Sequence, residues 1–190
     1  DVNGIVAPMV ESEFALQKFV EAVITNVSNE RRENIKFYIN IESKTAYENL
    51  DKILSSPSSK LLTGVVVGRS DLTKSFGYGK QDVVSSEMCE IVTDILKQCK
   101  SYGFKTLMGG NIGTSSIEFI KMLYQKNLLN NIETRNIIVD LNKVEINQLN
   151  DLIKNALFFE SSWLNCKADY YNKIGNHYLD RSKTILDRIS

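Results

Sequence analysis

Short apolar runs alternate with amphipathic helical patterns along most of this 190-residue chain, and this alternation constrains the fold more than any other feature. It is typical of parallel strands joined by crossover helices, because parallel neighbours need a long connection between them. The runs are continuously apolar, as expected for strands that helices cover on both faces. We predict parallel strands over residues 4–10, 37–42, 64–68, 106–110 and 136–141.

Helical patterns occupy the intervals between these runs and the C-terminal part. We predict helices over residues 12–27, 45–54 and 83–102, one that begins at Ser115, and a helical remainder from about Val144 with a candidate break at Gly175-Asn176. In the clearest pattern, Met88, Ile91 and Ile95 belong to one apolar stripe with three- and four-residue steps. Ser115 and Glu118 have the spacing of a capping box.

Two architectures fit this order of elements, an open doubly wound sheet and a TIM barrel. A complete barrel needs about 250 residues and eight strands, so this chain is short of one. In both architectures the functional site lies at the carboxyl ends of the strands. Polar residues at those ends are therefore the first candidates for function.

The composition limits the classes of partner. Lys plus Arg equals Asp plus Glu at 23 each, so the chain lacks the basic excess that nucleic acids and acidic membranes attract. No apolar stretch approaches the roughly 20 residues that span a bilayer, and no signal peptide is visible. We expect a cytoplasmic protein with no nucleic-acid or membrane partner.

Cysteine and histidine chemistry is poorly supported. Cys89, Cys99 and Cys166 are far apart and form no CxxC pair, which is typical of buried, reduced thiols in a cytosolic protein. The only histidine is His177, in a polar stretch that favours a plain surface residue. A histidine-based zinc site or a Ser-His-Asp triad within this chain is therefore not expected.

The first candidate for a ligand is Glu42, which ends the run that begins at Phe37. Side chains alternate along a strand, so Asn40 and Glu42 point to the same side. A buried carboxylate needs a cation, a proton or several hydrogen-bond donors. The alternatives are a helix N-cap or an exposed strand end.

The second candidate is Asp71, which follows the next run. Gly68 allows the backbone to approach a ligand closely or to turn sharply. The amides of Ser70 and Asp71 could then face a bound carboxylate, and Arg69 could add charge; alternatively, Asp71 caps the following turn. Because the ends of neighbouring parallel strands lie side by side, Glu42 and Asp71 can share one hard divalent cation.

Three weaker features complete the set. The glycine-rich segment 109–116 joins a strand to a helix start, which favours an anion site or a purely steric role, and it matches neither a Walker A loop nor the dinucleotide fingerprint. The segment 133–135 (Glu-Thr-Arg) is interpreted as a surface pair. The C-terminal part holds aromatic residues that favour core packing or a subunit contact: Phe158, Phe159, Trp163, Tyr170, Tyr171 and Tyr178.

Three segments in the same order resemble the HpcH/HpaI-type metal-dependent aldolase/citrate lyase family. They are Gly4-Ile-Val-Ala-Pro-Met-Val-Glu-Ser12, Asn40-Ile-Glu-Ser43 with Glu48-Asn-Leu-Asp-Lys-Ile53, and Gly64-Val-Val-Val-Gly-Arg-Ser-Asp-Leu72 with Ser75-Phe-Gly77. The resemblance covers roughly residues 4–141. It implies an α/β fold of the (β/α)8 TIM-barrel type, with about five parallel strands in this chain and a helical C-terminal extension. Residues 1–143 would form the C-terminal part of the barrel, and residues 144–190 a helical segment that packs on the barrel or on a neighbouring subunit.

The resemblance also implies roles for single residues. Glu42 and Asp71 take the positions of the family's ligands to a divalent metal, Mg²⁺, Mn²⁺ or Co²⁺. Asn40 takes the position that contacts the keto acid, and Ser70 the position whose amide meets its carboxylate. Arg69 stands where proline is common, which implies an altered substrate choice.

The implied activity is that of a carbon–carbon lyase, an aldolase that acts on a 2-keto acid. The metal is a Lewis acid that stabilises the enolate formed when the bond breaks. Two alternatives remain, an acyl-CoA ester lyase of the citrate lyase beta type and a non-catalytic partner domain derived from a barrel.

The resemblance begins at the family's fourth strand. The catalytic arginine and the base histidine of the family's first three strands match nothing in this chain, and His177 is in the wrong place. We expect the C-terminal portion of a barrel that is nearly inactive alone. We also expect it to form a homo-oligomer or to associate with the missing N-terminal part of the barrel.

Overall fold

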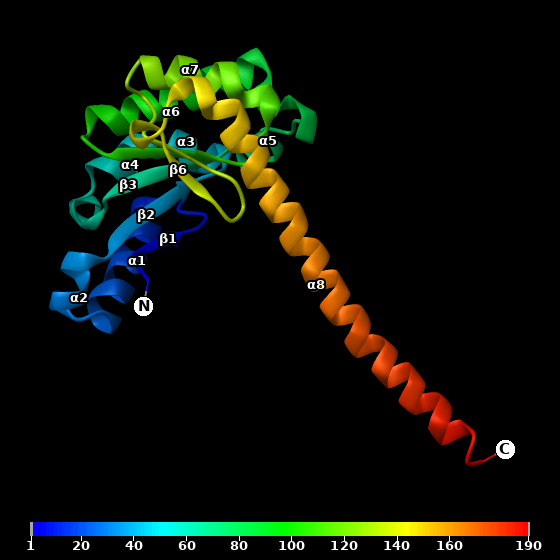
Figure 1. Cartoon of the computed structure of the whole chain (residues 1–190). Helices are drawn as coiled ribbons and strands as arrows, with labels where there is room; N and C mark the ends of the chain where they lie inside the picture. The colour runs from blue at the N-terminus through cyan, green and yellow to red at the C-terminus, as the bar shows by residue number, and fades with distance from the viewer. Residues whose placement is uncertain (1, 190) are drawn as a thin grey trace.

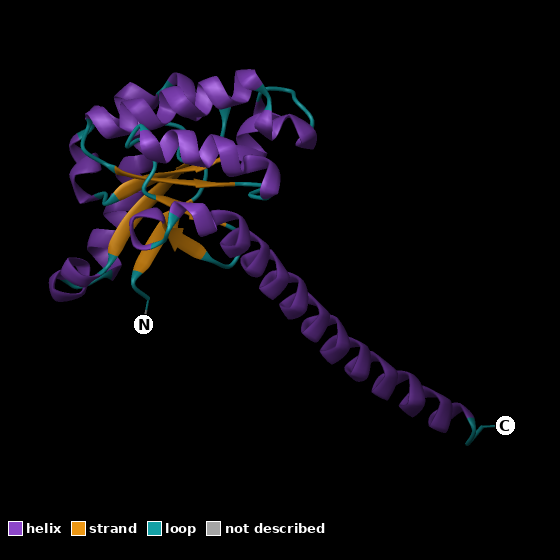
Figure 2. Ribbon diagram, turned by 45° about the horizontal axis from the view of Figure 1, so that its top comes forward, coloured by secondary structure: helices purple, strands orange, loops and turns teal. Residues whose placement is uncertain are grey.

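The computed structural model describes residues 2–189 and is built around one sheet whose strands follow the order of the sequence. The six strands are β1 (Gly4–Ala7), β2 (Lys36–Ile41), β3 (Gly64–Gly68), β4 (Lys105–Gly109), β5 (Asn131–Glu133) and β6 (Ile138–Asp140). β1 to β5 are parallel, and β6 is antiparallel to β5. The sheet is curled like half of a barrel, with helices on its outer face (Figures 1 and 2). A partial barrel fits this sheet, whereas a closed barrel is not formed by the described residues.

The helices are α1 (Glu13–Asn26), α2 (Asn29–Asn34), α3 (Lys44–Glu48), α4 (Leu50–Ser55), α5 (Arg69–Ser75), α6 (Ser86–Ser101), α7 (Ile117–Gln125) and α8 (Leu149–Leu186). The helices α1 to α7 lie between successive strands and cover the convex face of the sheet, whereas α8 follows the last strand (Figure 1). Short 3₁₀ turns lie between them: η1 (Pro57–Leu61), η2 (Lys80–Val84), η3 (Thr114–Ser116), η4 (Leu141–Lys143) and η5 (Ile146–Gln148).

The core lies between the sheet and this helical layer. Val65 and Val67 of β3 are fully buried in it, together with Met88 and Ile95 from the apolar stripe of α6. Burial of each such side chain contributes about 1.5–3 kcal/mol. Because side chains alternate along a strand, Val66 between them faces the concave side of the sheet.

The prediction for the last strand was partly wrong. The fifth parallel strand is β5, which the sequence analysis missed. The segment predicted as the fifth parallel strand is β6, which runs antiparallel. The reason is a tight turn, in which the amide of Thr134 donates to the carbonyl of Ile137 at 2.9 Å and reverses the chain.

Two helix predictions also need correction. The predicted helix 45–54 is divided into α3 and α4 at Asn49, whose side chain donates to the carbonyl of Glu11 at 3.0 Å. The predicted capping box of Ser115 and Glu118 does not form, since α7 begins at Ile117 after the turn η3.

Helix α8 is continuous, so the break considered at Gly175-Asn176 does not occur. Only its first turns are packed, with Leu149, Ile153 and Ala156 buried. The rest of the helix projects away from the sheet and ends far from it (Figure 1). In the part of the chain that the structure describes, no helix has both the length and the hydropathy needed to cross a membrane.

Candidate functional site

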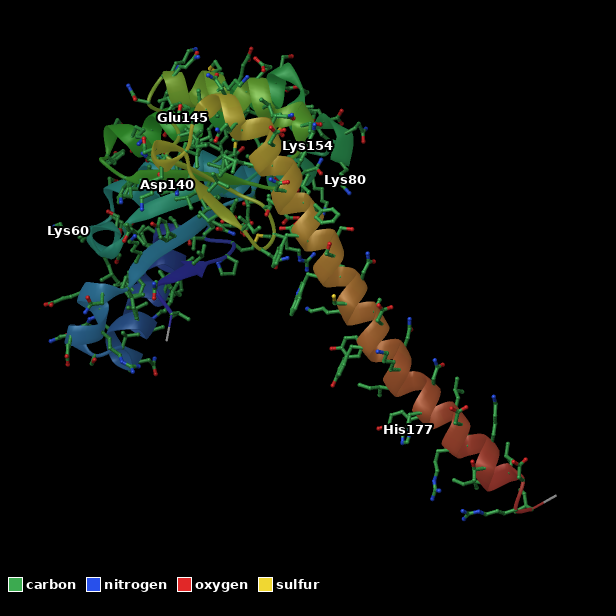
Figure 3. The ribbon with its side chains drawn as sticks, in the orientation of Figure 1. Lys60, Lys80, Asp140, Glu145, Lys154 and His177 are labelled. Carbon is green, nitrogen blue, oxygen red and sulfur yellow. The ribbon has the colours of Figure 1, made fainter. Side chains whose placement is uncertain are left out.

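A cavity of about 730 Å³ opens at the carboxyl ends of β2 to β5. The residues that line it are Asn40, Glu42, Gly68, Ser70, Asp71, Lys80, Gly110, Asn111, Ile112, Glu133, Thr134, Arg135, Asn136, Ile137, Ile138, Leu157 and Glu160. Four consecutive parallel strands and α8 thus contribute to one space. Lys80, labelled in Figure 3 near the first half of α8, is one of these lining residues.

Glu42 is held at the end of β2 with only 7% of its surface exposed. The backbone amide of Met9 donates to its Oε1 at 2.9 Å, and Asn40 Nδ2 donates to its Oε2 at 3.1 Å. A Cβ atom on Gly68 would lie 2.7 Å from Glu42 Oε2, so the glycine leaves the space that this carboxylate uses. The Oδ1 atom of Asn40 is buried without a hydrogen-bond partner among the described residues.

Asp71 lines the same cavity from the first turn of α5. Its side chain retains 49% of its exposure and forms an ion pair with Lys74 at 3.3 Å. Ser70 precedes it and also lines the cavity. The structure therefore brings Asn40, Glu42, Ser70 and Asp71 together, as their positions at strand ends predicted.

Arg69 has a different position from the one expected, since it is fully buried and is not among the cavity-lining residues. Its guanidinium donates to the carbonyls of Gly109 and Gly110, at 3.2 and 2.9 Å, and to Ser116 Oγ at 3.1 Å. These acceptors lie in the segment 109–116, from the last residue of β4 to the end of η3. The hydrogen bonds described for Arg69 therefore hold this segment, and its side chain does not reach the cavity where a ligand would bind.

Glu133 is a cavity residue that sequence reasoning missed, because it was interpreted as half of a surface pair. It lies at the carboxyl end of β5, and a Cβ atom on Gly109 would be 2.7 Å from its Cγ. Burial raises the pKa of the Glu133 carboxyl, and the negative charge of Glu42 raises it further. Glu133 also ends a strand, but β5 has only three residues, so the long apolar run that pointed to Glu42 is absent before it.

The turn between β5 and β6 forms the wall next to α8. Glu160 of α8 accepts hydrogen bonds from Thr134 Oγ1 at 2.6 Å and from the Asn136 amide at 2.8 Å. Arg135 lies in the same turn and lines the cavity. The first half of α8 is thereby bonded to the site.

The donors in the cavity suit a hard divalent cation, which prefers oxygen ligands. Glu42 and Asp71 offer carboxylates, and the unpartnered Oδ1 of Asn40 is an uncharged oxygen beside Glu42. Within residues 2–189, no group of three or more His, Cys, Asp and Glu side chains is close enough to hold a metal. Any cation bound at this place would therefore keep positions for water or substrate oxygens.

Cysteine and histidine do not contribute to this cavity. The three cysteines are unpaired, and burial raises the pKa of the Cys99 thiol to about 12. His177 lies on the projecting part of α8, far from the sheet (Figure 3). The surface position of His177 agrees with its interpretation from sequence, whereas the expectation of buried thiols holds for Cys99 alone, because Cys89 is half-buried and Cys166 is exposed.

Residues 1–111, more than half of the chain, match the family described as HpcH/HpaI aldolase/citrate lyase. The chain belongs to this family. The resemblance of the three sequence segments is thus confirmed at the level of the family. A search of curated proteins finds no relative of this sequence.

Solved structures share the fold. The citrate synthase SbnG superposes with a TM-score of 0.57 at 15% identity, over 86% of this chain and 65% of that one. The HpcH/HpaI aldolase from Desulfitobacterium hafniense DCB-2 superposes with a TM-score of 0.55 at 15% identity, over 70% of this chain and 57% of that one. Macrophomate synthase superposes with a TM-score of 0.51 at 18% identity, over 65% of this chain and 50% of that one. The chain thus spans less than two thirds of these structures, and at such identities the likeness concerns the fold alone.

Proposed function

We propose that this chain carries the metal- and substrate-binding part of a carbon–carbon lyase that acts on a 2-keto acid. One observation carries the proposal: Glu42 and Asp71, which are far apart in sequence, line one cavity at the carboxyl ends of parallel strands. Sites in barrels of this kind are built at that end. Membership in an aldolase and lyase family supports the class of reaction.

Glu42 and Asp71 would hold the cation, Mg²⁺, Mn²⁺ or Co²⁺, and Asn40 Oδ1 would meet the cation or the substrate. A divalent metal bound there would supply Lewis-acid stabilisation of the negative charge that develops on the keto oxygen. Asn40 and the Met9 amide hold the Glu42 carboxylate in one orientation through their two hydrogen bonds. A fixed ligand of this kind needs little reorganisation during the reaction.

Ser70 and the loop that contains Asn111 line the cavity, and the Ser70 amide would receive the substrate carboxylate. Lys80 and Arg135 also line the cavity and bring positive charge to it. The substrate is thus expected to be an anion that enters with its keto acid group toward Glu42.

We also propose self-association through the exposed part of α8. The accessible surface of the chain is 11,660 Å², whereas a compact 21.5 kDa monomer exposes about 9,200 Å². The excess of about 2,500 Å² is enough for a stable dimer interface. Large apolar side chains are exposed along this part of the helix, including Leu164, Tyr171 and Tyr178.

We also propose that the protein is cytoplasmic, which the unpaired cysteines support.

The test of the activity is a screen of 4-hydroxy-2-keto acids and malyl- or citramalyl-type CoA thioesters in the presence of Mg²⁺ or Mn²⁺, carried out on the chain together with the N-terminal part of the barrel, because the chain alone is expected to be nearly inactive. The proposal expects cleavage of a free keto acid that EDTA abolishes. Cleavage of the thioesters alone would assign the chain to the acyl-CoA ester lyases. Activity that is unchanged in EDTA would reject the metal-dependent mechanism, and failure to bind either the metal or a keto acid would leave a non-catalytic partner domain.

A further inference from the structure

Arg69 is the largest side chain that is fully buried among the described residues. It follows Gly68 directly at the end of β3, and its guanidinium reaches the backbone of Gly109, the last residue of β4. Burial lowers the pKa of the Arg69 guanidinium to about 10, so the group stays charged at neutral pH. A buried cation at this place requires an explanation, because burial of a charge costs free energy unless it is paired.

The partners of this cation are all neutral oxygens. Nε donates to the Gly109 carbonyl at 3.2 Å, and Nη2 donates to the Gly110 carbonyl at 2.9 Å and to Ser116 Oγ at 3.1 Å. A longer contact of 3.4 Å joins Nη2 to the Asn111 carbonyl. No hydrogen bond to a carboxylate is described for Arg69, and its Nη1 atom is buried without a partner within residues 2–189. The hydrogen bonds satisfy oxygens of the segment 109–116, but burial of the charge and the unpartnered Nη1 oppose that gain, so stability alone does not account for the arginine.

The loop that receives these bonds is strained and closely packed. Gly110 and Asn111 have φ values of +79° and +51°, in the left-handed region that favours glycine. A Cβ atom on Gly110 would lie 2.4 Å from the Ser70 amide nitrogen. The loop backbone therefore rests directly on the start of α5. Strained backbone of this kind persists only where the surrounding structure fixes it.

This loop is also a wall of the candidate site. Gly110, Asn111 and Ile112 line the cavity, together with Ser70 and Asp71 of α5. Arg69 lies behind this wall, because it bonds to the loop and does not line the cavity. The side chain can therefore shape the cavity only through the loop.

We propose that Arg69 is a positioning residue, whose two-pronged hydrogen bonding holds the loop 109–116 on the start of α5 and so shapes the wall that receives the carboxylate of the ligand. We call the hydrogen bonds from Arg69 to the loop 109–116 the clamp. The nature of the ligand rests on the proposed function, whereas the clamp does not. The planar fork of arginine directs Nε and Nη2 to separate acceptors, which a lysine ammonium cannot imitate. The clamp thus depends on the geometry of the side chain and not on its charge alone.

The experiment uses the 190-residue chain and the variants Arg69→Lys and Arg69→Met, with oxalate as a probe that resembles the planar enolate of a keto acid. Hydrogen exchange of the Ser116 amide, which donates to the Gly113 carbonyl at 3.0 Å, reports on the clamp, and calorimetry reports on the binding of Mn²⁺ and then of oxalate. Both variants are expected to exchange about tenfold faster in the loop and to lose about tenfold in oxalate affinity, with Mn²⁺ affinity unchanged. Arg32→Met is the matched control, because Arg32 also donates to a backbone carbonyl, that of Ile24, but lies in α2.

Each outcome decides a separate point. Arg69→Lys with the loop protection and the oxalate affinity of the native chain would overturn the clamp, because charge alone would then suffice. If Arg69→Met fails to fold, Ser116→Ala removes one acceptor only, and unchanged loop exchange in both Ser116→Ala and Arg69→Lys would also overturn it. A native chain that binds neither Mn²⁺ nor oxalate would contradict the proposed function, whereas the exchange rates would still decide on the clamp.

Discussion

Gly68 and Gly109 pair in register at the carboxyl ends of β3 and β4, and each lies beside a glutamate of the next strand outward. Glu42 approaches Gly68 from β2, and Glu133 approaches Gly109 from β5. The two glycines leave room for two carboxylates at neighbouring strand ends, and the charge of Glu42 acts on Glu133. This arrangement gives the cavity its negative charge and explains why the ends of two adjacent strands lack side chains.

The first prediction concerns Gly68→Ala. The added Cβ would lie 2.7 Å from Glu42 Oε2 and 2.9 Å from Glu42 Cβ, so the carboxylate must move. We expect the affinity for Mn²⁺, measured by calorimetry, to fall about 10- to 100-fold, as is typical when the support of a ligand is lost. The control is Gly113→Ala, since a Cβ at Gly113 would meet nothing within 4 Å. Equal affinities in the two variants would contradict the position of Glu42 as a ligand.

The second prediction concerns the pH dependence of stability through Glu133. Its pKa is raised above the ordinary value of 4.5 in the folded chain, so the folded chain holds the proton more tightly than the unfolded chain does. Stability therefore falls as pH rises from the ordinary pKa through the raised one, and stays lower above it. In EDTA, Glu133→Gln should raise Tm at neutral pH by a few degrees at most, and the difference should vanish at acidic pH.

The matched control for this measurement is Glu118→Gln, which changes an exposed glutamate of α7. Its Tm should follow that of the native chain across the same pH range. If the Tm of Glu133→Gln stays below the native value at neutral pH, the Glu133 carboxylate stabilises the fold, and the raised pKa is contradicted.

The third prediction concerns α8. Leu164, Tyr171 and Tyr178 are exposed and recur every seven residues, a spacing that suits contact with a second helix. Sedimentation equilibrium should therefore show a dimer or larger assembly. The double variant Leu164→Glu/Tyr171→Glu should be monomeric, while Asn165→Glu, on another side of the helix, should assemble normally. A native chain that sediments as a monomer would contradict self-association.

The sequence predicted those parts of the site that depend on local pattern. Glu42 directly follows β2 and Asp71 lies in the first turn after β3, and the parallel order of the strands then places both at one edge of the sheet. The same pattern did not identify Glu133, because β5 has only three residues and no long apolar run precedes this acid in the sequence. The direction of β6 depends on the turn at Thr134, which strand propensity alone does not reveal.

Arg69 and α8 show two other limits. The direction of the Arg69 side chain is set by acceptors 40 or more residues later in the chain, which no local pattern contains. At Gly175 the pattern suggested a break, yet one glycine costs only about 1 kcal/mol and the 38-residue helix continues through it.

The most direct test of the account is a calorimetric titration of the chain with Mn²⁺, beside the variants Glu42→Gln and Asp71→Asn and the surface control Glu118→Gln. The account predicts a single site in the native chain and in Glu118→Gln, and at least a tenfold loss of affinity in each of the two cavity variants. A native chain that does not bind Mn²⁺, or cavity variants that bind it as tightly as the native chain, would contradict the shared cation site.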